Sequence, residues 1–82
     1  MFWIVYILQS QKDKSYYTGI TTNLKERISA HNLGQTKYTA SKMPYVLVWY
    51  CVFNNKKIAL NFEKYLKSGS GIAFRNKRLT NL

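Results

Sequence analysis

Acidic residues are scarce in this sequence. Only 3 Asp or Glu residues stand against 13 Lys or Arg residues in a chain of 82, which gives a formal net charge of +10. So large a basic excess favours an anionic partner, and nucleic acid is the first class to consider because Lys and Arg displace condensed counterions from phosphates. An anionic membrane surface is the second class, and a charge that serves only solubility is the third.

The chain has a single cysteine, Cys51, and no long apolar segment. One cysteine excludes an internal disulfide framework and a zinc site built from cysteines, so a reducing cytoplasm fits best. The longest apolar run covers residues 45–53, well short of the roughly 20 residues that a membrane helix needs. The first charged residue, Lys12, follows the first apolar run instead of preceding it, so we expect no signal peptide.

Apolar and aromatic residues are plentiful. They make up 46% and 16% of the chain, which is too much for a disordered basic tail. A chain of this length forms one domain, so we expect residues 1–82 to fold as a single unit. Its hydrophobic core must be thin, because small domains bury a smaller fraction of their surface than large ones.

Three apolar segments predict strands. Residues 2–8 form a continuous β-branched and aromatic run, typical of a strand buried on both faces. Residues 9–15 are polar and turn-like, and residues 16–20 form a second short strand, so these segments predict an antiparallel hairpin. The unbroken run at residues 45–53 predicts the centre of a small sheet that is covered on both sides.

The first helix has clear end signals. Asn23 is a good N-cap, and Glu26 follows three residues later as in a capping box. The helix is expected to run to about residue 32, with Gly34 as its stop. Leu24 and Ile28 form its apolar stripe, which should face the sheet.

The rest of the chain completes an α/β (α+β) fold. Residues 34–44 lack periodicity and predict a surface loop. Residues 57–67 predict a second helix, residues 68–71 should break it, and residues 72–79 predict a short basic third helix. The expected order is therefore β-β-α-β-α-α, a three-stranded antiparallel sheet flanked by helices. The apolar stripe of the second helix consists of Ala59, Phe62 and Leu66.

The three carboxylates differ in how easily local structure explains them. Asp13 lies in the hairpin loop, where turn chemistry accounts for it. Glu26 lies near the positive end of a helix dipole. Glu63 lies in the middle of the second helix, on the flank of its apolar stripe, and should face the sheet edge. It is either the partner of Lys67 in an i,i+4 ion pair or a metal ligand, since Mg²⁺ is often held by one or two carboxylates.

Four other polar residues are candidates for a site. Arg27 and His31 are four apart and share one helical face, where they can bind an anion and transfer a proton. The alternative is a solvated arginine and a structural histidine. Tyr6 and Tyr17 lie in the first two predicted strands, where cross-strand packing is the usual role of tyrosine.

Together these residues resemble the signature of the GIY-YIG nuclease superfamily. Ile4-Val5-Tyr6 is followed after ten residues by Tyr17-Thr18-Gly19, and then by Arg27, His31 and Glu63. The resemblance also covers residues 37–39 and 63–67, so it spans almost the whole chain. In size and arrangement the chain is similar to the small single-domain bacterial members of the family, close to the excision-nuclease type. The first tripeptide lacks the leading glycine of the family, and the second has threonine in place of isoleucine.

This resemblance implies hydrolysis of phosphodiester bonds with one divalent ion, Mg²⁺ or Mn²⁺, held by Glu63. Tyr6 would be the general base and Tyr17 would orient water, with His31 as the alternative proton acceptor. Arg27 would bind the scissile phosphate, because its fork matches two oxygens. With Asp13 and Glu26 explained by turn and cap, one carboxylate cannot assemble a two-metal site.

The expected partner is DNA, in particular branched or single-stranded DNA in repair, recognised by structure more than by sequence. We expect no membrane partner, because the basic residues are scattered and no helix combines a wide apolar face with a lysine-rich one, and no small-molecule cofactor. The alternatives are a non-catalytic nucleic-acid-binding module of the same fold and a small interaction protein. The residues expected to contact nucleic acid are Lys37, Tyr38, Lys42, Lys67, Arg75, Lys77 and Arg78.

Overall fold

The computed structural model describes residues 1–37 and 39–80, and within them the chain forms three strands and three α-helices. None of the helices in this part of the chain is long and apolar enough to cross a membrane. The order β-β-α-β-α-α is the predicted one. In chain order the elements are β1 (Trp3–Ser10), β2 (Tyr16–Thr21), α1 (Leu24–Asn32), a 3-10 turn (Ala40–Lys42), β3 (Tyr45–Phe53), α2 (Lys56–Leu66), α3 (Gly69–Phe74) and a π-helical turn (Arg75–Leu79).

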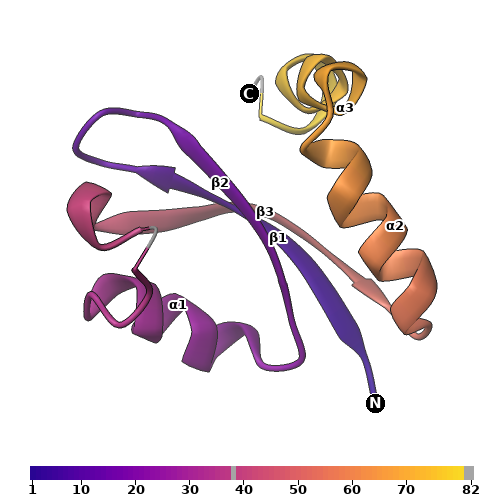
Figure 1. Ribbon diagram of the computed structural model, residues 1–82, viewed down its shortest axis with the longest axis horizontal. Helices are drawn as coiled ribbons and strands as arrows, with labels where there is room; N and C mark the ends of the chain where they lie inside the picture. Colours follow the sequence, from indigo (N-terminus) through magenta and orange to yellow (C-terminus); the bar gives the residue numbers. More distant parts are fainter. Residues whose placement is uncertain (38, 81–82) are drawn as a thin grey trace.

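The strands form one antiparallel sheet in the order β2-β1-β3. Helix α1 covers one face of this sheet, and α2 with α3 covers the other (Figure 1). Strand β1 is therefore both central and enclosed between two layers of helix. This position explains its continuous apolar run, because a strand covered on both faces needs no polar side.

The prediction that residues 45–53 form the central strand was wrong. Strand β3 lies at the edge of the sheet and pairs with β1 alone. Tyr45 is buried against α1, whereas Leu47, Tyr50 and Val52 farther along β3 are exposed. An apolar run indicates a strand, but it does not reveal how many neighbouring strands it has, because pairing is decided by distant segments.

Two apolar clusters hold the layers together. Val5 and Ile7 of β1 pack against Ala59 and Leu66 of α2, which confirms the predicted stripe of that helix. On the opposite face, Tyr6 and Leu8 pack with Tyr45, and Leu24 and Ile28 of α1 cover them, which confirms the predicted stripe of α1. Neighbouring residues of β1 therefore point into different layers, as the alternation of a strand requires.

The predicted break between the second and third helices is present but shorter than expected, since α2 ends at Leu66 and α3 begins at Gly69. Ser68 caps α3 by accepting a hydrogen bond from the Gly71 N–H at 3.1 Å, so α3 begins at Gly69 instead of residue 72. A Cβ atom at Gly71 would lie against the backbone of Tyr65 and 2.7 Å from the Cα of Leu66. Glycine is needed there because α3 folds back closely onto the end of α2, and not because the chain turns freely.

The segment 34–44 is not simply a surface loop. Thr39 is buried, with 1% of its surface exposed. The side chain of Asn32 binds both backbone groups of Tyr45, donating at 3.0 Å and accepting at 2.6 Å, and the Ser10 hydroxyl donates to the carbonyl of Lys42 at 2.6 Å. These hydrogen bonds hold the C-terminal end of the segment in place, and Thr39 of the segment is buried against the rest of the protein. Tyr38 lies outside the described residues.

Candidate functional site

Tyr6 and Gly19 face each other across β1 and β2. The Tyr6 ring lies directly over the glycine, so that a Cβ at position 19 would meet the hydroxyl oxygen and come within 2.6 Å of Cζ. The glycine of the second signature tripeptide is therefore required by the tyrosine of the first. This close approach fixes where the Tyr6 hydroxyl lies.

His31, from the last turn of α1, is fully buried and uses both ring nitrogens. Nε2 is 3.0 Å from the Tyr6 hydroxyl oxygen, and Nδ1 is 2.7 Å from the Thr39 hydroxyl oxygen. Sequence reasoning gave Thr39 no role of its own, because a side chain in a segment without periodicity carries no signal of burial. Tyr6, His31 and Thr39 form a continuous buried chain of polar groups.

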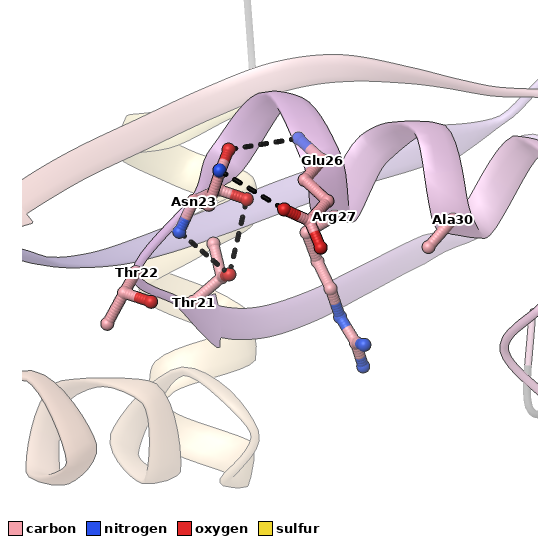
Figure 2. A pocket seen from close by; sticks show the side chains of 6 residues that line it. All are labelled: Thr21, Thr22, Asn23, Glu26, Arg27 and Ala30. Carbon is pink, nitrogen blue, oxygen red and sulfur yellow. Dashed lines mark hydrogen bonds between the residues drawn. The ribbon is translucent and has the colours of Figure 1, made fainter.

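Arg27 and Tyr17 complete this side of the site. The Tyr17 ring lies 4.9 Å from the His31 ring and 6.3 Å from the Tyr6 ring, measured between centroids. Arg27 lines a cavity of about 240 Å³ together with the N-cap residue Asn23. Its side chain extends away from the hydrogen-bonded group around Asn23 (Figure 2). Among the described residues the buried Nε of Arg27 has no hydrogen-bond partner. A buried donor without a partner is costly, and a bound phosphate would satisfy it.

Burial and the arginine set the protonation of this cluster. Burial raises the pKa of Tyr6 to about 12, although the neighbouring Arg27 acts in the opposite direction. Burial and then the positive charge of Arg27 lower the pKa of His31, so its imidazole is neutral at neutral pH. Interaction with the Tyr6 hydroxyl raises the pKa of Arg27, which stays charged. The cluster therefore presents one fixed cation among neutral groups.

Glu63 comes from α2, the helix on the other face of the sheet from α1, and lies near enough to Tyr6 to affect its pKa. Its negative charge contributes to the raised pKa of Tyr6. Its side chain is only 14% exposed and pairs with Lys67 at 2.9 Å from Nζ to Oε2. The lysine Nζ also lies 6.0 Å above the Tyr17 ring. The predicted ion pair thus forms, and it does so beside the tyrosines.

The other two carboxylates have the local roles predicted for them. Asp13 accepts hydrogen bonds from the N–H and hydroxyl of Ser15 in the hairpin loop, at 2.9 and 2.6 Å. Glu26 follows the N-cap Asn23, whose side chain accepts from the Glu26 N–H and donates to its carboxylate. In the described part of the chain no three His, Cys, Asp or Glu side chains cluster as a metal site. A metal ion bound here would thus have Glu63 as its one carboxylate ligand, with water and phosphate oxygens as the others.

Two of the predicted nucleic-acid contacts lie next to the site. Lys67 and Arg75 line a second cavity of about 250 Å³, which Tyr16, Tyr17 and Ile72 also line. The Arg75 guanidinium lies 4.6 Å above the Tyr16 ring. This cavity adjoins the cluster at Tyr17. Lys67 and Arg75 give it positive charge, and Tyr16 and Tyr17 form part of its wall.

The remaining predicted contacts are more dispersed. Lys42 is tied to the hairpin loop by an ion pair with Asp13 at 3.1 Å. Lys37, Lys77 and Arg78 are exposed to solvent. Tyr38 cannot be placed, because it lies outside the described residues. The structure thus brings Lys67 and Arg75 beside the tyrosines and leaves Lys37, Lys42, Lys77 and Arg78 exposed elsewhere on the surface.

Fold and site together define a family of nucleases. Residues 2–76 match the family model described as the GIY-YIG catalytic domain, and the chain belongs to this family. It is also similar to proteins named UPF0213. It is 50% identical over 64 residues to one from Clostridium perfringens and 42% identical over 64 residues to one from Streptococcus pyogenes serotype M5, in each case over 77% of this chain and 68% of the relative.

A solved structure has the same fold. The solution NMR structure of a UPF0213 protein from Bacillus halodurans matches with a TM-score of 0.60 and 34% sequence identity. The match covers 96% of this chain and 87% of that protein. The similarity therefore extends through both helical layers and includes the elements that carry Tyr6, Arg27 and Glu63.

Proposed function

We propose that this protein is an endonuclease that hydrolyses phosphodiester bonds in DNA with one divalent ion, Mg²⁺ or Mn²⁺. One observation carries the proposal: two tyrosines, a histidine and an arginine from three elements converge, and Glu63 lies near enough to affect the pKa of Tyr6, in a chain with only 3 acidic residues. In a pure nucleic-acid binder this carboxylate would neutralise Lys67 and repel phosphate, which weakens binding. Catalysis gives that carboxylate a reason to be present.

Arg27 is the proposed phosphate ligand. Its guanidinium lies next to the tyrosine hydroxyls and its buried Nε has no partner within the described part of the chain. A guanidinium can bind two phosphate oxygens with parallel hydrogen bonds. Fixed donors of this kind stabilise the charge that builds up on the phosphate in the transition state, which is commonly a large part of catalysis.

Tyr6 is the proposed general base for the attacking water, with Tyr17 orienting that water. A tyrosine works as a base only as the phenolate, and the pKa of Tyr6 is raised to about 12, mainly by burial. Arg27 already opposes burial in this value, so further positive charge must lower the pKa of Tyr6 in the complex with metal and nucleic acid. His31 is the alternative acceptor, because its imidazole is neutral and 3.0 Å from the Tyr6 hydroxyl.

Glu63 is the proposed ligand of the ion. A divalent ion held there would supply positive charge that stabilises the leaving 3′ oxygen. Lys67, which otherwise pairs with this carboxylate, would be released to contact a phosphate. Arg75 lies in the cavity beside it and can bind the next phosphate along the strand. Contacts to the backbone alone favour recognition of DNA structure over sequence.

The decisive experiment compares wild-type protein with the variant Glu63→Gln on labelled branched and linear DNAs, with Mg²⁺ or Mn²⁺. We expect ion-dependent cleavage by the wild type, its loss in Glu63→Gln, and DNA affinity that is kept or slightly increased. Asp13→Asn, which removes the same charge in the hairpin loop, is the matched control and should cleave normally. Equal cleavage by Glu63→Gln would contradict the metal ligand, and binding without cleavage of any substrate would favour the non-catalytic module.

A further inference from the structure

The buried His31 must divide two hydrogen bonds between its ring nitrogens. Nδ1 lies 2.7 Å from the hydroxyl oxygen of Thr39, and Nε2 lies 3.0 Å from that of Tyr6. A neutral imidazole has one N–H donor and one acceptor nitrogen, so the two bonds run in the same direction along the chain. Either Thr39 donates and the ring donates to Tyr6, or Tyr6 donates and the ring donates to Thr39.

The surroundings of Thr39 decide between these arrangements. If the ring donated to Thr39, the threonine hydroxyl would have to donate elsewhere, and the available acceptor is the Thr36 carbonyl at 3.4 Å. That carbonyl already accepts from the N–H groups of Thr39 and Ala40, at 3.1 and 3.0 Å. A third, long bond there is weak, whereas 2.7 Å from Thr39 to Nδ1 is typical of a hydroxyl donor.

We infer that Thr39 is a positioning residue that donates its hydroxyl hydrogen to Nδ1 of His31 and so keeps the imidazole proton on Nε2, where it is donated to Tyr6. The 3.0 Å distance from Nε2 to the Tyr6 oxygen is typical of an N–H donor. The other groups around the ring are the Tyr17 and Tyr45 rings and the charge of Arg27. An arginine is no acceptor, so it does not compete for the Nε2 hydrogen.

The catalytic consequence rests on the proposed function. With its proton on Nε2, neutral His31 cannot take a proton from Tyr6, which leaves Tyr6 as the base. The Tyr6 oxygen receives the imidazole N–H, so the hydrogen of its own hydroxyl is not donated to His31 and passes to solvent water when the phenolate forms. The phenolate that remains is then stabilised by the His31 N–H on one side and by Arg27 on the other.

NMR tests the hydrogen-bond arrangement without any assay of activity. His31 is the only histidine in the chain, so ¹⁵N spectra of uniformly labelled protein show one imidazole. We expect a protonated Nε2 and an unprotonated Nδ1 in the wild type and in Thr39→Ser. In Thr39→Val neither tautomer satisfies Nδ1, so the two tautomers should exchange and the two ¹⁵N shifts should move towards each other. A protonated Nδ1 in the wild type, or an unchanged spectrum in Thr39→Val, overturns the inference.

Single-turnover cleavage with saturating protein tests the role in catalysis. Thr39→Val should lower the rate constant by about tenfold to a hundredfold, as expected for a lost buried hydrogen bond, with unchanged DNA affinity, and Thr39→Ser should restore it. Thr36→Val is the matched control, because Thr36 contributes only its carbonyl to the hydrogen bonds of the described residues. A normal rate in Thr39→Val removes the catalytic role. Absence of cleavage by the wild type defeats the proposed function, while the NMR result still decides the tautomer.

Discussion

At the scale of single residues, the central feature is a buried tyrosine whose proposed role requires it to lose a proton. Tyr6 is fully buried, its ring is fixed over Gly19 and its hydroxyl lies 3.0 Å from Nε2 of His31. Burial favours the neutral phenol, whereas Arg27 favours the phenolate. In the protein without bound nucleic acid burial dominates, so the active protonation state is a minor one.

The pH dependence of cleavage should therefore follow Tyr6. With a pKa of about 12, the phenolate fraction and the rate should rise about tenfold per pH unit above neutrality, until the bound complex reaches its own lower pKa. The measurement is single-turnover cleavage between about pH 6.5 and 9.5, with Tyr6→Phe expected to lose activity. Tyr50→Phe is the control, because Tyr50 is paired with Tyr6 across the sheet but is exposed. A rate independent of pH would count against Tyr6 as the base.

The same shift links Tyr6 to stability. Its pKa in the folded protein, about 12, lies above the ordinary tyrosine value of 10.0. The folded protein thus holds this proton more tightly than the unfolded chain, and its stability contribution is lost as the pH rises between these two values. Denaturation followed at increasing pH should show this loss in the wild type and a smaller loss in Tyr6→Phe.

At the scale of secondary-structure elements, the sequence predicts what depends on neighbouring residues. Asn23 and Glu26 mark the start of α1 because a cap is made by residues three apart, and the structure has that cap. The edge position of β3 and the burial of Thr39 depend on segments far away in the chain. For the site, the motif predicted Tyr6 and its partners. The hydrogen bond between Thr39 and His31 could be recognised only in the three-dimensional structure.

Helix α3 offers a test of the close packing between two consecutive helices. Gly71→Ala should destabilise the protein by about 1–3 kcal/mol, since the new Cβ collides with the backbone of Tyr65 and Leu66. Gly69→Ala in the same helix is the matched control, because its Cβ would meet nothing within 4 Å. Gly69→Ala should be neutral or stabilising by about 0.5–1 kcal/mol. Urea unfolding of both variants measures the difference, and equal stabilities would show that α3 does not pack closely on α2.

At the scale of the whole molecule, the net charge of +10 means that positive side chains surround a site in which most groups are neutral. Lys67 and Arg75 lie beside that site, and Lys42 is held at the hairpin loop. Charges near the site should hold the scissile strand, and those elsewhere should raise the rate of encounter with DNA. The two groups can be separated by their effect on salt dependence.

Arg75→Ala and Lys56→Ala remove one positive charge each from opposite ends of the α2–α3 segment. Arg75 lies above Tyr16 in the cavity next to Tyr17, whereas Lys56 lies 4.9 Å above the Trp3 ring at the start of α2. If Arg75 contacts a phosphate, its loss removes one released counterion, and the slope of log affinity against log salt should fall in magnitude by about 0.7 for single strands or 0.9 for duplex. Lys56→Ala should leave the slope unchanged. Fluorescence anisotropy over a salt series measures both, and equal slopes in wild type and Arg75→Ala would mean that the strand does not cross this cavity.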